Sequence, residues 1–258
     1  MKKFMMDTHM HFDLYNNYNE VLDYIDGNNS YTIAVTNLPD LFERYSHLCG
    51  KRRFVKIALG FHPELACQYS NQILKFDRYI SATRYIGEVG LDFTTKDWTN
   101  RSIQDQVFSH IVHTCNEVGG KVLTVHSRRA EKRVMEILKN LSSCGVILHW
   151  YSGSITLMDE ALMRGYYFSI NHQMLQSVNG RKIVDRIPID RILIESDAPF
   201  TKGLDKNYSI EFMKPIYQYI CDARGLSEAE LSVILKSNFR TLLTNCQQIT
   251  RESNYDTI

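Results

Sequence analysis

Histidines and carboxylates recur along this chain at positions that could form a hydrolytic metal site. His9 and His11 are separated by one residue, so on an extended strand their imidazoles project to the same side. Two neighbouring neutral imidazoles chelate divalent ions well. Further groups of the same chemical kind follow at Glu88, His126, His149 and Asp197. Six such groups exceed the needs of one ion. They suit two divalent ions that share a carboxylate, an arrangement used to hydrolyse phosphoryl bonds.

These groups need a fold that gathers them, because 188 positions separate His9 from Asp197. Short apolar runs alternate with segments of helical periodicity such as 102–118, 130–141 and 155–164. We predict strands at 4–6, 31–36, 54–59, 85–89, 122–125, 146–148, 166–170 and 192–194. Continuous apolar strands between helices indicate a buried parallel sheet. Eight of them in a chain of 258 residues predict an α/β fold of the (β/α)8 TIM-barrel type. A doubly wound parallel sheet is the alternative.

Nearly every predicted strand ends in a polar, chemically capable residue. Besides the six groups above, these ends contain Asp7, His62, Asp92, Arg128 and Glu195. The carboxyl ends of the strands in a parallel barrel meet at one face, where barrel enzymes place their active sites. We therefore expect all these side chains to line a single cup.

Composition limits the class of protein. We expect one catalytic domain over residues 1–246 and a polar C-terminal extension over 247–258. The 30 Lys and Arg residues against 29 Asp and Glu residues give a net charge of +1, so any contact with nucleic acid has to be local. The six cysteines form no C-x-x-C pair and are expected to be reduced. The sequence offers no good membrane span, and we expect a cytoplasmic protein.

Seven short motifs occur in the order and spacing of a known family. They are DTHMHF at 7–12, GFHP at 60–63, GEVGLDF at 87–93, R-x-x-Q-x-x-x-F at 101–108, VHSRRA at 125–130, HWYSG at 149–153 and IESDAP at 194–199. Through these motifs the chain resembles the TatD family of metal-dependent deoxyribonucleases, in the amidohydrolase-like superfamily. Within that family it is similar to the TatD-like members of Qat-type anti-phage defence clusters, which would imply protein partners from the same cluster.

The resemblance implies a role for each residue. One ion would be held by His9, His11, Glu88 and Asp197, and a second by Glu88, His126 and His149. Glu88 and Asp197 would be the catalytic carboxylates, with Asp197 as general base. His62 and Arg128 would bind the substrate phosphate, and Asp7, Asp92 and Glu195 would position ligands and loops. The implied reaction is hydrolysis of DNA phosphodiester bonds with Mg²⁺, Mn²⁺ or Zn²⁺, as a 3′→5′ exonuclease on single strands or ends.

Two other functions stay open on the sequence. One is hydrolysis of an amide or ester, as in a D-aminoacyl-tRNA deacylase; the other is an inactive barrel that serves as a partner-binding subunit of a defence complex. Glu88 stands where many superfamily members bridge their metals with a modified lysine, and this favours the TatD-like branch. His126 and His149 could instead be core histidines, and His62 could be a helix cap beside Pro63. We expect a loop or rim structure at Asn171-His172, and candidates for base stacking at Phe93, Trp98, Trp150 and Tyr151.

Overall fold

The strands of the computed structural model, which describes residues 5–253, are all parallel. In the described chain they are β1 (Met5–Met10), β2 (Ser30–Ala34), β3 (Val55–Ile57), β4 (Tyr85–Gly90), β5 (Val122–His126), β6 (Gly145–His149), β7 (Tyr167–Ile170) and β8 (Ile192–Ile194). They pair in chain order as a three-stranded set, β1 to β3, and a five-stranded set, β4 to β8. Most strand residues are buried and apolar, as expected for a sheet that helices cover.

Backbone hydrogen bonds join the two sets at both seams. Between β3 and β4, Leu59 N donates to Tyr85 O and Gly87 N donates to Leu59 O, each at 2.9 Å. Beyond β8, Asp197 N donates to His9 O at 2.9 Å, which connects the end of β8 to β1. The strands therefore close into the predicted (β/α)8 barrel, and the doubly wound alternative is wrong.

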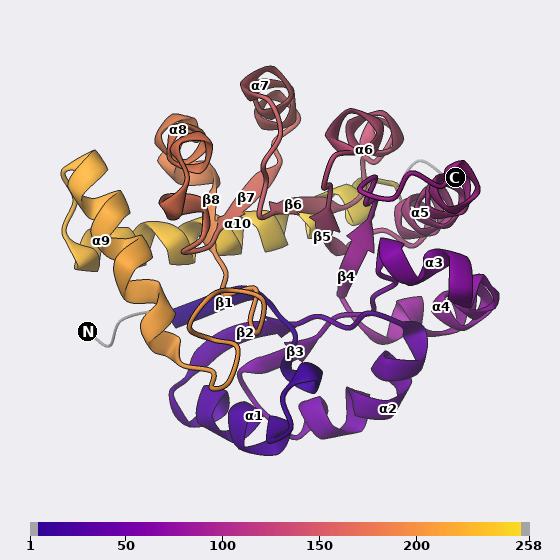
Figure 1. Ribbon diagram of the computed structural model, residues 1–258, viewed down its shortest axis with the longest axis horizontal. Helices are drawn as coiled ribbons and strands as arrows, with labels where there is room; N and C mark the ends of the chain where they lie inside the picture. The colour runs from indigo at the N-terminus through magenta and orange to yellow at the C-terminus, as the bar shows by residue number, and fades with distance from the viewer. Residues whose placement is uncertain (1–4, 254–258) are drawn as a thin grey trace.

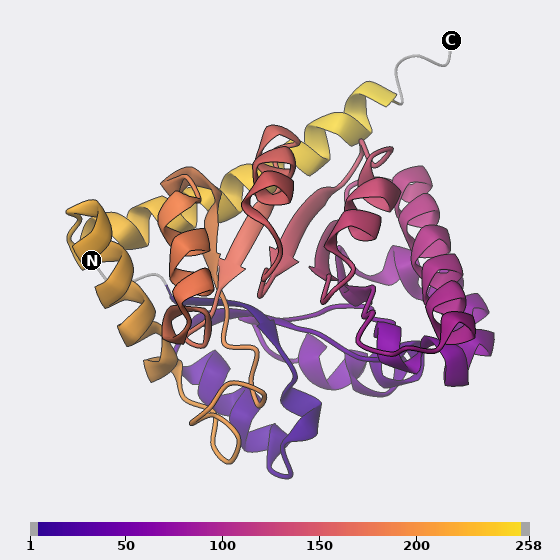
Figure 2. The same ribbon diagram turned by 45° about the horizontal axis from the view of Figure 1, so that its top comes forward.

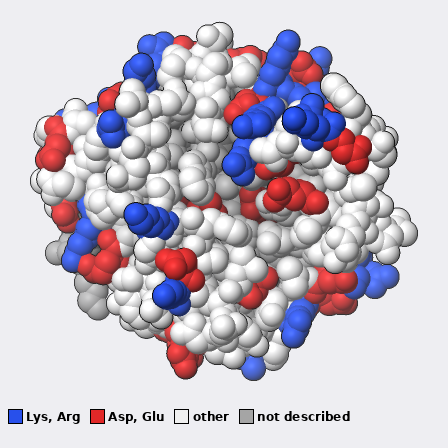
Figure 3. Space-filling view, viewed as in Figure 1, with Lys and Arg blue, Asp and Glu red and all other residues white. Residues whose placement is uncertain are grey.

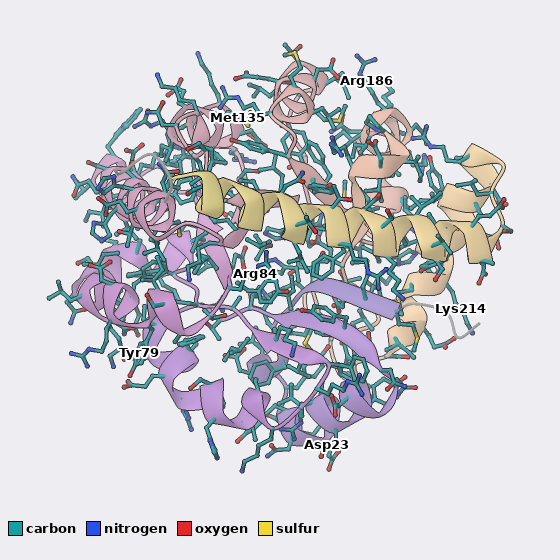
Figure 4. The ribbon with its side chains drawn as sticks, turned by 180° about the vertical axis from the view of Figure 1, so that it is seen from behind. Asp23, Tyr79, Arg84, Met135, Arg186 and Lys214 are labelled. Carbon is teal, nitrogen blue, oxygen red and sulfur yellow. The ribbon has the colours of Figure 1, made fainter. Side chains whose placement is uncertain are left out.

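Helices surround the barrel (Figure 1). They are α1 (Tyr18–Gly27), α2 (Pro39–Gly50), α3 (Pro63–Tyr69), α4 (Ile73–Tyr79), α5 (Trp98–Val118), α6 (Glu131–Leu138), α7 (Ile155–Met163), α8 (Val178–Arg186), α9 (Met213–Arg224) and α10 (Glu228–Ser253). Many of them bury an apolar stripe, which in α6 consists of Val134, Met135 and Leu138. The long α10 crosses the end of the barrel from which the strands point away (Figures 2 and 4). The opposite end, where the strands finish, is left for the site.

Close backbone contact between strands explains one glycine. A Cβ on Gly60, just after β3, would lie 1.5 Å from Thr36 O and 2.6 Å from Gly87 O. Only a residue without a side chain lets the ends of β2, β3 and β4 approach this closely.

The predicted elements agree with the structure to within a few residues. The main difference is at strand ends: β1, β5 and β6 extend as far as Met10, His126 and His149, so the candidate ligands lie on strands instead of following them. Phe4, in the first predicted strand, lies outside the described residues. The predicted boundary between 246 and 247 falls within α10, and residues 254–258 also lie outside the described part.

Two compositional expectations can be compared with the structure. None of the six cysteines, all of which lie within the described residues, forms a disulfide; four are buried, Cys144 is partly buried and Cys67 is exposed. No helix in the described residues is both long and apolar enough to cross a membrane.

Candidate metal centre

A cavity of about 460 Å³ opens at the carboxyl ends of the strands. Figure 3 shows it as a hollow with acidic side chains inside, and with basic side chains at its rim on the α6 side. Its lining is formed by His62, Glu64, Glu88, Asp92, His126, Ser127, Arg128, His149, Trp150, Ser152, Asp197 and Phe200. The barrel therefore places most of the predicted site residues in one cup.

Glu88 lies at the centre of the cup, and each of its carboxylate oxygens faces a different pair of histidines. Oε1 is 2.7 Å from His126 Nδ1 and 2.9 Å from His149 Nε2. Oε2 is 3.1 Å from His11 Nε2 and 3.4 Å from His9 Nε2. The side chain is only 3% exposed. One carboxylate is thus placed between two imidazole pairs that come from β1 on one side and from β5 and β6 on the other.

Asp197 completes the β1 side of the cluster. Its Oδ1 lies 3.8 Å from His9 Nε2 and 3.7 Å from His11 Nε2. Within the described residues, donor atoms close enough to share an ion form three groups: His9 with Glu88 and His149, His9 with His11 and Asp197, and His62 with Glu88 and His126. Imidazole nitrogens and carboxylate oxygens are common ligands of divalent transition ions, so these residues fit a metal.

The protonation states reflect this crowding of buried groups. Burial opposes ionisation of Glu88, yet the charges of His62 and His149 hold its pKa well below the usual value. Burial holds the pKa of His9 well below its usual value, and the positive charge of His149 lowers it further. Burial lowers the pKa of His126, but hydrogen bonds to Asp92 and Glu88 outweigh it and raise that pKa to about 9. Burial also raises the pKa of Asp197 well above its usual value, with help from Glu195 and Glu88.

The far nitrogen of two imidazoles is hydrogen-bonded to a polar group, and that of a third lies near a carboxylate. His9 Nδ1 is hydrogen-bonded to Thr124 Oγ1 at 2.7 Å. His126 Nε2 is hydrogen-bonded to Asp92 Oδ2 at 2.9 Å. His149 Nδ1 lies 3.7 Å from Glu195 Oε1. In the neutral form of such a ring, a proton held on the far nitrogen leaves the lone pair of the other nitrogen on the side of Glu88, which is the arrangement a metal ligand needs.

Glu195 and Asp7 are themselves fixed in place. Ser169 Oγ and Asn171 Nδ2 donate to Glu195, the latter at 3.1 Å, and Trp150 N donates to it at 3.0 Å. Asp7 contacts no imidazole side chain. It accepts from Ser196 N at 2.8 Å and Tyr208 Oη at 2.9 Å, which ties the loop after β8 to β1.

His62 is a helix cap, as one sequence interpretation predicted, and its ring also lines the cavity. Its Nδ1 accepts a hydrogen bond from Glu64 N at 3.2 Å and so caps α3. Its Nε2 faces the cup, 3.5 Å from Glu88 Oε1. With Nδ1 as the acceptor, the ring proton lies on Nε2, and His62 presents an N–H donor to the cavity.

The backbone is strained at three of the strand ends. Arg129, Trp150 and Asp197 adopt left-handed φ values of 56°, 38° and 47°. Such conformations cost non-glycine residues about 1–3 kcal/mol and gather where function constrains the chain. Here they turn the backbone sharply after β5, β6 and β8.

Some residues that contact the candidate site were not predicted from the sequence. Thr124, Ser169, Asn171 and Phe200 all contact the site or its supports, and Asn171 is buried against Glu195 instead of forming a rim. Thr124 had a signal: it is the polar residue two positions before His126 in an apolar strand, so both face the same way.

The four aromatic candidates for base stacking separate into three groups. Only Trp150 lines the cavity. Tyr151 is 2% exposed and packs edge-on against Phe168, so its prediction as a stacking residue is wrong. The guanidinium of Arg101 lies 5.2 Å from the ring centres of both Phe93 and Trp98, and neither ring lines the cavity.

Comparisons with known proteins agree with this architecture. The family profile of TatD related DNases matches residues 6–244. Among relatives, the uncharacterized metal-dependent hydrolase YabD of Bacillus subtilis is 26% identical over 81% of this chain and 82% of its own length. Human deoxyribonuclease TATDN3 is 27% identical over 80% of this chain and 81% of its own length. The crystal structure of YjjV, a TatD homolog from Escherichia coli, superposes with a TM-score of 0.81 at 21% identity, covering 92% of this chain and 97% of that one. This chain therefore belongs to the family of TatD related DNases, as a metal-dependent hydrolase.

Proposed function

We propose that this protein is a divalent-metal-dependent deoxyribonuclease that hydrolyses phosphodiester bonds at unpaired strands or strand ends of DNA in the 3′→5′ direction. The observation that carries the proposal is the position of Glu88, with one carboxylate oxygen facing His9 and His11 and the other facing His126 and His149. A carboxylate in this position is suited to bridge two ions.

The proposed ligand sets follow from these contacts. His9, His11 and Asp197 would hold one ion together with Glu88 Oε2, and His126 and His149 would hold a second together with Glu88 Oε1. When bound, such ions lower the pKa of water and neutralise charge on phosphoryl oxygens. The mixed nitrogen and oxygen donors are compatible with Zn²⁺, Mn²⁺ and Mg²⁺.

The remaining residues suit the handling of a phosphodiester. Asp197 is the proposed general base, because its carboxylate lies beside the β1 histidines, with Oδ1 3.7 Å from His11 Nε2 and 3.8 Å from His9 Nε2. His62 presents its Nε2–H to the cavity, and Arg128 lines the same cavity, so both can donate to phosphate oxygens. Glu88 is 3% exposed, which favours a strand end that enters the cup over a phosphate held within an intact duplex.

The test is cleavage of a 3′-labelled single-stranded oligonucleotide by the purified protein. We expect shortening from the 3′ end with Mg²⁺ or Mn²⁺, and no cleavage in excess EDTA. A 5′-labelled strand distinguishes the two directions. Glu88→Gln is expected to abolish cleavage while circular dichroism stays that of the wild type. Glu211→Gln is the matched control, because Glu211 forms an ion pair with Lys214 on the surface and does not line the cavity.

Other activities would give different results in the same assays. Release of the amino acid from a D-aminoacyl-tRNA without cleavage of DNA would identify an ester hydrolase and refute the nuclease. Metal binding without hydrolysis of either substrate would support a binding subunit. Full activity of Glu88→Gln would refute the bridging role of this carboxylate.

A further inference from the structure

We infer that Trp150 and Phe200 form an aromatic contact site for the base of the nucleotide whose phosphate enters the cup, and so select strands with unpaired bases. The inference rests on the proposed function. It adds recognition of the base, which the candidate metal centre does not provide. Metal ions and basic groups contact the phosphate, whereas discrimination between a strand with bases and any other phosphodiester needs a surface for the bases.

Phe200 is an exposed aromatic ring beside the candidate ligands. Its residue is 58% exposed although the ring is large and apolar. The ring lies edge-on to that of His11, with centres 5.3 Å apart and an interplanar angle of 84°. It also lines the cavity that contains Glu88. No packing of the barrel core requires an exposed ring here, which makes it available for a ligand.

Trp150 comes from the end of β6, and its backbone is held in place by a hydrogen bond. It directly follows the candidate ligand His149, is partly buried, and lines the same cavity. Its φ of 38° is unfavourable for a residue with a bulky side chain. The hydrogen bond from its N–H to Glu195 Oε1, at 3.0 Å, stabilises this turn. The carboxylate that lies beside His149 Nδ1 therefore also holds the backbone from which the indole projects.

The rest of the lining is polar, and this supports a nucleotide as the occupant. Arg128, Ser127 and His62 offer hydrogen-bond donors, and the two aromatic rings offer apolar faces. A nucleotide at a strand end has the same two parts, a charged phosphate and a flat base. Stacking is largely independent of base identity, because every base has a π-face. A paired base has its faces covered by its neighbours, so a contact of this kind favours unpaired ends.

The chain offers a spectroscopic test that does not depend on catalysis. It contains two tryptophans, Trp98 and Trp150, and only Trp150 lines the cavity. In Trp98→Phe, which preserves a ring beside Arg101, fluorescence reports on Trp150 alone. We expect saturable quenching with an oligothymidylate carrying terminal phosphorothioates in the presence of Mg²⁺. An abasic strand with the same number of phosphates is expected to give at most a small fraction of that quenching.

Kinetics test the same contact through KM. With bases present, we expect Trp150→Ala and Phe200→Ala each to lower kcat/KM by about tenfold or more, mainly through KM, which is the usual size of one base–aromatic stack. On the abasic strand the same variants should match the wild type. Trp150→Phe and Phe200→Tyr keep a flat ring and should retain most of the activity. Trp98→Ala, outside the cavity, is the aromatic control.

The outcomes separate the two proposals. Equal quenching by the thymidylate and abasic strands, or equal losses on both substrates in the alanine variants, would overturn the aromatic contact while the nuclease assignment stands. Base-dependent quenching in a protein that cleaves no DNA would uphold the contact and overturn the proposed nuclease. Quenching that fails to saturate would also overturn the contact.

Discussion

Three histidines of the candidate metal centre each depend on a group from a neighbouring strand or loop. Thr124 supports His9, Asp92 supports His126, and Glu195 lies beside His149. These partners decide which nitrogen carries the proton, and therefore which lone pair faces Glu88. At the scale of single residues, the chemistry of the site is set by these supports as much as by the ligands.

Thr124→Val tests the support of His9. Valine keeps the methyl group but removes Oγ1, which leaves His9 Nδ1 buried without a partner. Loss of such a support typically weakens metal binding by about 10–100-fold, and we expect this range in a titration with Mn²⁺. Thr124→Ser retains the hydroxyl and should bind nearly as tightly as the wild type. Equal affinities for the valine and serine variants would show that Thr124 contributes packing only.

The pKa of His126 predicts how metal uptake varies with pH. With a pKa of about 9, this imidazole is protonated at neutral pH in the metal-free protein. It must lose its proton before it can bind a metal, so uptake releases a proton and apparent affinity rises with pH until about 9. We expect a rise of about tenfold or more per pH unit between 7 and 9.

Isothermal titration in buffers of different ionisation enthalpy measures the proton release directly. Asp92→Asn removes the charge that favours protonated His126. The affinity of this variant for Mn²⁺ should therefore rise at a lower pH than that of the wild type. An affinity for Mn²⁺ that is constant between pH 7 and 9 would contradict the assignment of His126 as a ligand.

At the scale of elements, the sequence predicts the strands well because each is a short apolar run, and predicts the site because polar residues interrupt these runs at one end. His9, Glu88 and His149 were identified in this way. Ser169 and Asn171 were not, because small polar residues near strand ends are common and carry no signal of their own. Their role depends on β7 lying next to β8, which places them against Glu195.

Phe200 shows a second limit of the sequence. An aromatic residue after a strand is expected to pack in the core, and only the fold reveals that this ring is exposed and lies beside His11. Tyr151 shows the reverse, since its position next to Trp150 suggested a role in the cup whereas the chain turns it into the core.

The contact of β2, β3 and β4 around Gly60 gives a prediction at this scale. In Gly60→Ala the new methyl group would meet two backbone carbonyls, which cannot rotate away as a side chain could. We expect a loss of about 3 kcal/mol or more in the free energy of unfolding, measured with urea on metal-free protein. Gly27→Ala is the control, because a Cβ at Gly27 meets nothing within 4 Å. Similar unfolding midpoints for the two variants would contradict the tight seam.

At the scale of the whole molecule, charge balance and metal binding are connected. A net charge of +1 gives the chain little general attraction for DNA, and the cup itself contains Glu88, Asp92 and Asp197. Bound divalent ions would supply positive charge where the phosphate must lie. The expected footprint on DNA is therefore small and centred on the metals.

Metal binding should also stabilise the whole fold, because the candidate ligands come from β1, β4, β5, β6 and the end of β8. Free Mn²⁺ at about 100 times its Kd should increase the free energy of unfolding by about 2.7 kcal/mol. For a domain of this size that corresponds to a rise in Tm of about 5–10 °C, which scanning calorimetry can measure against EDTA-treated protein. Glu88→Gln should show no such rise. An equal rise in the variant would mean that the stabilising ions bind elsewhere.

At the carboxyl ends of the strands, the residues with left-handed backbone conformations imply a conflict between stability and activity. Trp150 and Asp197 each hold a side chain with a proposed function on a backbone that glycine would adopt with less strain. Selection for heat resistance alone would favour glycine at these positions and remove the base contact or the carboxylate, whereas selection for activity would retain the strain. Arg129 has the same backbone conformation but is exposed and outside the cavity lining. It is therefore the place where a more thermostable enzyme could be engineered without loss of function.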